Sequence, residues 1–219
     1  MRGIGGSSIT GARDLVTRVF GVLAAAAAAE HGVGEALQGS RAPAGPFIQS
    51  WPDSAFFRIE AGEPALTLVP NLLSSGVLTL LLSALLGWRV LVRSARRPRL
   101  DLFGLSILLL LAGGGFGPPA LGLAVATAAS LPEPRRRHRS GLLARAFWWI
   151  FAATVLVWLT LVPGLPLLDL ALGTGDAAVL PVIILAFTLF PVCVAAARAA
   201  DAARILSVNA SAQLSKETR

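Results

Sequence analysis

Long apolar segments separated by short polar ones run through this chain of 219 residues. They cover residues 15–37, 64–92, 102–131, 146–162 and 177–200. An α-helix needs about 20 apolar residues to cross the hydrocarbon core of a bilayer. Runs such as Ile107–Leu111 do not alternate apolar and polar residues, as the strands of a membrane barrel do. The pattern predicts an all-α fold, a polytopic bundle of transmembrane helices forming one integral membrane domain over residues 1–219.

The third segment is interrupted by the sequence GGGFGPP. Its helix-breaking residues are Gly113, Gly114, Gly115, Gly117, Pro118 and Pro119. Each glycine weakens a helix by about 1 kcal/mol, and an interior proline costs about 3 kcal/mol. We expect two short helices over residues 102–112 and 118–131, with arms of about 17 Å, roughly half the hydrocarbon thickness. That length favours a re-entrant hairpin beside about four full spans. One long helix, kinked at the glycines, is the alternative.

Charge favours the hairpin and predicts a topology. The net charge is +7, with 18 arginines and one lysine, although only 14% of the residues are charged and 55% are hydrophobic. Two arginine clusters, Arg93–Arg99 and Arg135–Arg145, flank the third segment, and the positive-inside rule favours the cytoplasm for both. Only a segment that doubles back allows this. We therefore expect both termini and the tail 201–219 in the cytoplasm, and the loop 39–63 outside.

A polar cluster interrupts the first apolar segment. Residues 15–29 would form about 22 Å of helix, too short for a hydrocarbon core of about 30 Å, so a spanning helix must continue toward Leu37. His31, Glu35 and Gln38 then share one stripe, with Glu30 on an adjoining face. Gly32 and Gly34 leave room for close helix packing. We predict a site for an ion, a proton or a substrate beside the GGGFGPP break, formed by Glu30, His31, Glu35, Gln38 and, from the second span, Asn71.

Three other interpretations of this cluster remain open. The residues from Glu30 onward lie in the lipid headgroup region, or His31 and Glu35 form a hydrogen-bonded pair that only stabilises the helix. Alternatively, residues 1–29 are a signal peptide that is cleaved after the alanine run. The aromatic loop that follows is expected to cover this end of the helix as a cap, with a substrate lid as the alternative.

Motifs of nucleotide binding and soluble catalysis are missing from the sequence. It contains no phosphate-binding loop, no Gly-x-Ser-x-Gly elbow and no His-Glu-x-x-His motif. Cys193 is the single cysteine, so neither a disulfide framework nor a cysteine-based metal site is expected. We assign no catalytic residue and no cofactor, and leave open whether the His31 region binds a metal. An enzyme is less favoured than a protein without catalytic activity.

Three stretches, EHGVGEALQG, FIQSWP and GGGFGPP, resemble parts of small, uncharacterised multi-pass membrane proteins of bacteria. The resemblance covers roughly residues 1–130 and implies a bacterial membrane protein, but it implies no activity and no site residue. The abundance of Ala, Arg and Gly with a single Lys is typical of a GC-rich bacterial genome. Together with the charge pattern, this predicts a location in the bacterial cytoplasmic (inner) membrane.

The leading functional hypothesis is a small transporter or channel-like protein for a proton, a cation or a small solute, because ionisable residues and irregular backbone are both expected inside the bilayer. One alternative is a non-catalytic membrane subunit or assembly factor. Another is a membrane enzyme acting on a lipid or a quinone. The expected partner is the lipid bilayer, with a second copy or another membrane protein as further candidates. The arginines are interpreted as topology signals, so nucleic acid is not expected.

Overall fold

The structure is a computed structural model that describes residues 11–92, 100–132, 141–173 and 175–217. The arginine clusters Arg93–Arg99 and Arg135–Arg139, and residues 1–10, lie outside the described residues. The helices are α1 (Ala12–Leu37), α2 (Leu72–Leu91), α3 (Leu100–Ala112), α4 (Gly117–Ser130), α5 (Gly141–Leu159), α6 (Leu165–Leu172) and α7 (Val179–Glu217). Three one-turn elements complete the helical structure: η1 (Arg58–Glu60), η2 (Thr160–Gly164) and η3 (Asp176–Ala178).

The fold is mostly helical, and three helical stretches of the described chain are long and apolar enough to cross a bilayer. They are Leu72–Leu91, Gly141–Leu172 and Asp176–Ser207. Helix α3 is apolar but shorter. Helix α1 is long enough to cross a bilayer, since its 26 residues would extend about 39 Å. The polar residues in its C-terminal half make it less apolar than the three stretches named above. The membrane class predicted from the sequence is therefore supported by three apolar helices.

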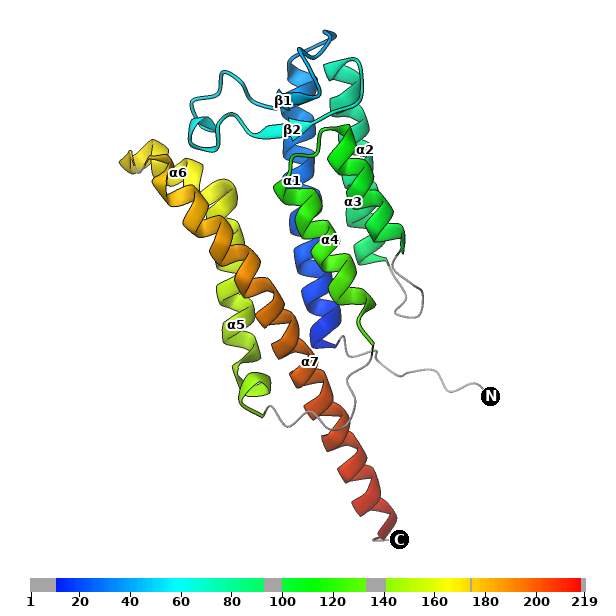
Figure 1. Ribbon diagram of the computed structural model, residues 1–219. Coiled ribbons are helices and arrows are strands. Elements are labelled where there is room, and N and C mark those ends of the chain that lie inside the picture. The colour runs from blue at the N-terminus through cyan, green and yellow to red at the C-terminus, as the bar shows by residue number, and fades with distance from the viewer. Residues whose placement is uncertain (1–10, 93–99, 133–140, 174, 218–219) are drawn as a thin grey trace.

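Helix α1 lies at the centre of the molecule and packs against α2, α4 and α7 (Figure 1). Helices α5 and α7 pair with each other beside this group. Phe20 of α1 joins the two parts, because its ring makes edge contacts with Phe151 of α5 and Phe190 of α7, at 6.1 and 5.2 Å between ring centroids. The hydrophobic core therefore runs along α1, and residues on α1 have neighbours from most of the chain.

Glycines allow α1 and α2 to cross closely. A β-carbon on Gly32 would lie 2.9 Å from the carbonyl oxygen of Gly76, and one on Gly76 would overlap that of Gly32. Close packing at Gly32 agrees with the expectation from sequence. Gly34 has a different neighbour, since a β-carbon there would lie 2.5 Å from the carbonyl oxygen of Ser50 in the loop between α1 and α2.

The third apolar segment forms two helices, with α3 ending at Ala112 and α4 beginning at Gly117. They run side by side in opposite directions (Figure 1). The turn leaves the carbonyl of Ala112 without a helical partner, and the hydroxyls of Ser75 and Thr79 on α2 donate to it at 2.6 and 2.9 Å. Side-chain hydroxyls thus satisfy the backbone where the helix is interrupted, as buried irregular backbone requires.

Several boundaries differ from those expected. The segment beginning at Pro64 starts with strand β2 (Pro64–Leu66), which pairs antiparallel with β1 (Phe47–Gln49), and helix begins only at Leu72. The short β-ladder leads the loop back across the end of α1. The fourth helical stretch continues past Val162 through α6. The fifth is one long helix that extends through residue 217, so the predicted tail is a continuation of α7.

The far end of α7 also stabilises the start of α1. The carboxylate of Asp201 accepts hydrogen bonds from the backbone N–H groups of Ala12 and Arg13, at 2.6 and 3.1 Å. These are among the first amide groups of α1, which have no partner within the helix. An acidic side chain from another helix therefore takes the place of a local cap, and its charge favours the positive end of the helix dipole.

Candidate functional site

His31 is the centre of a buried polar site at the end of α1 that the loop covers. Its ring is 2% exposed. The Nδ1 atom lies 2.9 Å from the hydroxyl of Ser50, and the Nε2 atom lies 2.7 Å from a carboxylate oxygen of Glu63. Both ring nitrogens are therefore held by residues of the loop between α1 and α2. A proton on Nε2 donates to Glu63, and Nδ1 accepts from Ser50 in the neutral ring and donates to it in the imidazolium.

Glu63 is held in place by the β-hairpin and by an unusual backbone conformation. The amide of Ser50 donates to the carbonyl of Glu63 at 3.0 Å, next to the β1–β2 ladder. Glu63 itself has a φ of 57°, in the left-handed region that costs a non-glycine residue about 1–3 kcal/mol. This conformation persists only where surrounding contacts stabilise it. Here the bond to His31 is such a contact.

Glu30 completes a cluster of three possible ligands. One donor atom from each of Glu30, His31 and Glu63 lies within 4.8 Å of the other two. The Trp51 indole lies beside the Glu30 carboxylate, but neither Glu30 oxygen makes a hydrogen bond with a described residue. An imidazole nitrogen with two carboxylates is a ligand set that suits zinc, manganese or iron. The hydroxyl of Ser50 on Nδ1 would orient the ring, as outer partners of metal-binding histidines do.

Glu60 adds a further carboxyl group beside this cluster, in the loop. Burial, together with the neighbouring Glu63 carboxylate, raises the pKa of Glu60 to about 10. Burial also acts on Glu63, but its bond to His31 and the neighbouring Glu60 outweigh burial and lower the pKa of Glu63 below its ordinary value. At neutral pH, therefore, Glu60 carries a proton and Glu63 carries a negative charge.

A cavity of about 410 Å³ opens from the acidic cluster toward α7. Glu30, His31, Glu60 and Glu63 line one part of it. The remaining wall is largely apolar and comes from η1, the start of α4, η2 and the first turns of α7. This size is in the usual range for small-molecule sites, about 300–1,000 Å³. The cavity thus gives the buried acids a space in which to meet a ligand.

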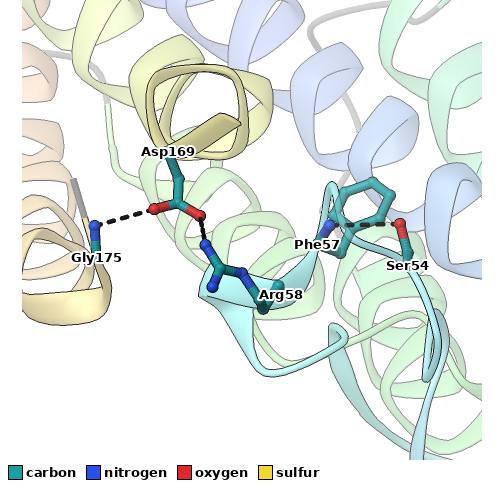
Figure 2. A network of polar contacts seen from close by, with 5 residues as sticks. All are labelled: Ser54, Phe57, Arg58, Asp169 and Gly175. Carbon is teal, nitrogen blue, oxygen red and sulfur yellow. Dashed lines mark hydrogen bonds and ion pairs between the residues drawn. The ribbon is translucent and has the colours of Figure 1, made fainter. Parts of the chain in front are cut away.

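An ion pair fastens the acidic loop to α6. Arg58, at the start of η1, donates to the carboxylate of Asp169 at 2.8 Å, and the other oxygen of that carboxylate accepts from the amide of Gly175 at 2.9 Å. Figure 2 shows Asp169 of α6 between these two partners, with the η1 segment next to the helix. The guanidinium of Arg58 is thus engaged by an acid outside the cluster.

Glu35 lies one turn after His31 and is fully buried. Its carboxylate is next to the hydroxyls of Ser50 and Ser75, but those hydroxyls bond to His31 and to the Ala112 carbonyl, and neither Glu35 oxygen makes a hydrogen bond with a described residue. A β-carbon on Gly113 would overlap this carboxylate. The glycine turn therefore packs directly on the polar stripe of α1. A buried carboxylate without a partner is costly unless a proton or a cation neutralises it.

The other two predicted site residues have different places. Gln38 is at the C-terminal end of α1, where its amide donates to the carbonyls of Gln49 and Ser50 at 3.0 Å. It thereby fixes the loop that carries Ser50. Asn71 is outside the cluster: its side chain accepts from the amide of Ser74 at 3.1 Å and donates to Ser40 at 2.9 Å. Asn71 is the N-cap of α2, and the structure does not bring it together with the other predicted site residues.

Sequence reasoning missed Ser50, Glu60 and Glu63. It had assigned the loop 39–63 to the outer side of the membrane and had given these two glutamates no role in the site. The stretch IEAGEP carries two acids three residues apart in a loop with little other charge, which is the one local signal. Their contact with α1 depends on the β1–β2 pairing, and strands of three residues are too short to be found by pattern.

Comparisons with known proteins assign no function to the site. No protein-family model, no curated protein and no solved structure matches this chain significantly.

Proposed function

We propose that this protein is a small transport protein of the bacterial inner membrane that exchanges protons for metal cations at the Glu30–His31–Glu63 cluster. The observation that carries the proposal is the mutual distance of at most 4.8 Å among donor atoms of these three residues, next to a cavity. Buried ionisable groups within a membrane protein are expensive and typically serve ion or proton pathways.

The coupling follows from the chemistry of one nitrogen. The Nε2 atom of His31 has a single lone pair, which binds either a proton or a metal ion. In the proton-bound state the ring is an imidazolium, whose Nε2–H donates to Glu63 over 2.7 Å and whose Nδ1–H donates to Ser50 over 2.9 Å. A metal ion that binds Nε2 displaces the proton on that nitrogen and leaves a neutral ring with its proton on Nδ1, so that one proton leaves the site. Glu63 is then free to become a second ligand and Glu30 a third. Binding of the cation and release of the proton are thus one event.

The helix break supports a transport role because it brings irregular backbone to the buried acids. Gly113 packs on Glu35 and Gly115 packs on His31, so close that a β-carbon on either would overlap the side chain. Interrupted helices that meet a polar site are typical of secondary transporters. Glu35, buried one turn from His31, offers a second group that a proton or a cation can neutralise.

For the membrane, we propose four full spans formed by α1, α2, α5 and α7, with α3 and α4 as a re-entrant hairpin. At 1.5 Å per residue, the 13 residues of α3 and the 14 of α4 extend about 20 Å each, less than the hydrocarbon thickness of about 30 Å. This arrangement places both arginine clusters and both termini in the cytoplasm. The loop with Glu60 and Glu63 is then on the outer side.

Transport into vesicles tests the function. The protein is reconstituted into liposomes that enclose a pH-sensitive dye and a metal-sensitive dye, and Zn²⁺ or Mn²⁺ is added outside. We expect metal entry with opposite proton movement, and loss of both in the His31→Ala and Glu63→Gln variants. The Glu35→Gln variant tests the second ionisable group. It should still bind the metal ion, because the three proposed ligands are intact, but the accompanying proton movement should change.

Asn71→Ala provides the matched control, because Asn71 caps α2 and does not touch the cluster. It should transport at the rate of the unchanged protein. Uptake that ignores pH and survives the His31→Ala substitution would remove the proposal.

A further inference from the structure

We infer that the cavity beside the acidic cluster binds an amphipathic organic cation, a compact positive centre attached to a hydrophobic body. This inference rests on the proposed cation-binding function and names a substrate class for the same site. It comes from the two unlike parts of the cavity wall.

The charged part of the wall is acidic throughout. Four carboxyl-bearing residues line the cavity: Glu30, Glu60, Glu63 and Asp176. The lining residues that the structure describes include neither Lys nor Arg. Such a surface attracts cations and rejects anions. A soft organic cation keeps little ordered water, so it enters an acidic pocket of this kind with a smaller desolvation cost than a small inorganic ion.

Glu30 is the acid of the cluster that offers an unpaired charge. The carboxyl oxygens of Glu30 and Glu60 are buried and make no hydrogen bond with a described residue, whereas Glu63 is bonded to His31. Glu60 carries a proton, so the charge comes from Glu30. A ligand with a positive centre supplies the partner that the fold does not. Replacing Glu30 therefore removes a ligand contact without breaking a contact that holds the structure.

A metal ion or a proton at the acidic cluster leaves most of the apolar wall without a contact. It includes Phe116 before α4, Leu161 and Val162 of η2, and Val179, Leu180 and Ile183 of α7. Within about 410 Å³ this wall provides space for an aromatic or branched alkyl body. The side chains of Phe116 and Leu180 are partly exposed, at 42% and 64%, so the apolar wall continues to the surface of the molecule.

Binding of tetraphenylphosphonium, a hydrophobic cation, tests the inference, with tetraphenylborate as a probe of the same shape and opposite charge. Purified protein in a neutral detergent is titrated with each probe, and separately with Zn²⁺. The variants are Glu30→Gln, which removes a charge, and Ile183→Trp, which fills the apolar wall. Ile184→Trp is the matched control, because this neighbour on α7 is exposed and does not line the cavity.

We expect tetraphenylphosphonium but not tetraphenylborate to bind, and both Glu30→Gln and Ile183→Trp to weaken binding about tenfold or more. Ile184→Trp should bind normally, and Ile183→Trp should keep its affinity for Zn²⁺. If Zn²⁺ binds and tetraphenylphosphonium does not, the substrate class is wrong while the cation site stands. Binding of the organic cation that neither variant changes also overturns the inference. If neither cation binds, the proposed function fails as well.

Discussion

Gly115 lies so close to the imidazole of His31 that a β-carbon at this position would overlap the Nε2 atom. The same residue has a φ of 73°, which L-amino acids with side chains rarely adopt. Two independent requirements therefore select glycine here: the turn after α3 and the space for the ring. The nitrogen in question is also the one that bonds to Glu63. The helix break and the polar site are thus parts of one packing arrangement.

Gly115→Ala should disturb the site and the fold together. The left-handed backbone alone should cost about 1–2 kcal/mol, and displacement of His31 adds to that. We expect a lower unfolding temperature in detergent and loss of cation binding. Gly117→Ala is the control, since a β-carbon on Gly117 meets no neighbouring atom within 4 Å. It should leave both properties unchanged, and equal behaviour of the two variants would show that Gly115 does not support the site.

This packing shows how far the sequence could lead. Helix propensity alone predicts an interruption at GGGFGPP, because four glycines and two prolines weaken any helix, and the structure separates α3 from α4 there. The pattern of apolar residues along the chain and the composition likewise predict apolar helices. The local sequence pattern does not show which side chain each glycine contacts. That Gly113 meets Glu35 and Gly115 meets His31 follows from the way α1 packs against the turn, which depends on the whole bundle.

The loop between α1 and α2 is the part of the site that the sequence predicted least well. His31 and Glu35 were selected from their spacing on α1, and both are buried in the site. Asn71 was selected by its depth along an assumed helix from Pro64, but strand β2 occupies that start and moves Asn71 to the cap of α2. Glu63 was passed over for the same reason. A pair of three-residue strands therefore accounts for the place of Asn71 at the cap of α2 and for the omission of Glu63 from the predicted site.

Asn71→Ala should lower stability without affecting binding. The side chain satisfies the free amide of Ser74 at the start of α2, and loss of such a cap typically costs about 1 kcal/mol. We expect a slightly lower unfolding temperature and unchanged affinity for Zn²⁺. Asn71→Asp, which keeps the capping oxygen, should restore the temperature. Weaker Zn²⁺ binding by Asn71→Ala would return this residue to the site.

Glu60→Gln should flatten the dependence of stability on pH. The folded protein binds the Glu60 proton with a pKa of about 10, against an ordinary value of 4.5. The stabilisation from this proton is complete below pH 4.5 and is lost as the pH rises toward 10, because the unfolded side chain ionises first. Glutamine does not titrate. The variant should equal the unchanged protein near pH 4.5 and be the more stable one at pH 9.

Thermal unfolding at a series of pH values measures this difference. Asp53→Asn is a suitable comparison, since Asp53 is an exposed acid of the same loop. It should follow the pH profile of the unchanged protein. Parallel profiles for Glu60→Gln and the unchanged protein would mean that Glu60 is ionised at neutral pH.

Gly76→Ala should separate α1 from α2. A β-carbon on Gly76 would overlap the carbonyl oxygen of Gly32 and crowd the backbone of Ala36, and backbone cannot turn aside as a side chain can. Overpacking of this kind costs about 1–3 kcal/mol. Gly87→Ala on the same helix is the control, because its β-carbon would lie 3.5 Å from that of Ala25, an ordinary contact. Thermal unfolding should show a loss for Gly76→Ala only; a loss of the same size in both would point to helix flexibility instead of crossing distance.

The membrane position of the α3–α4 pair can be measured by labelling single cysteines from one side of the membrane. Cys193 is buried and is first replaced by alanine, and Arg96→Cys, Arg136→Cys or Ala44→Cys is then introduced.

Because α3 and α4 run antiparallel, the start of α3 and the end of α4 lie at the same end of the bundle. Arg13 at the start of α1 donates to the carbonyls of Leu131 and Pro132 after α4, which ties these ends together. Positions 96 and 136 should therefore react only with a reagent on the cytoplasmic side, and position 44 only with one outside. Labelling of 96 and 136 from opposite sides would require the pair to cross the membrane as a single span, which two antiparallel helices of about 20 Å cannot do.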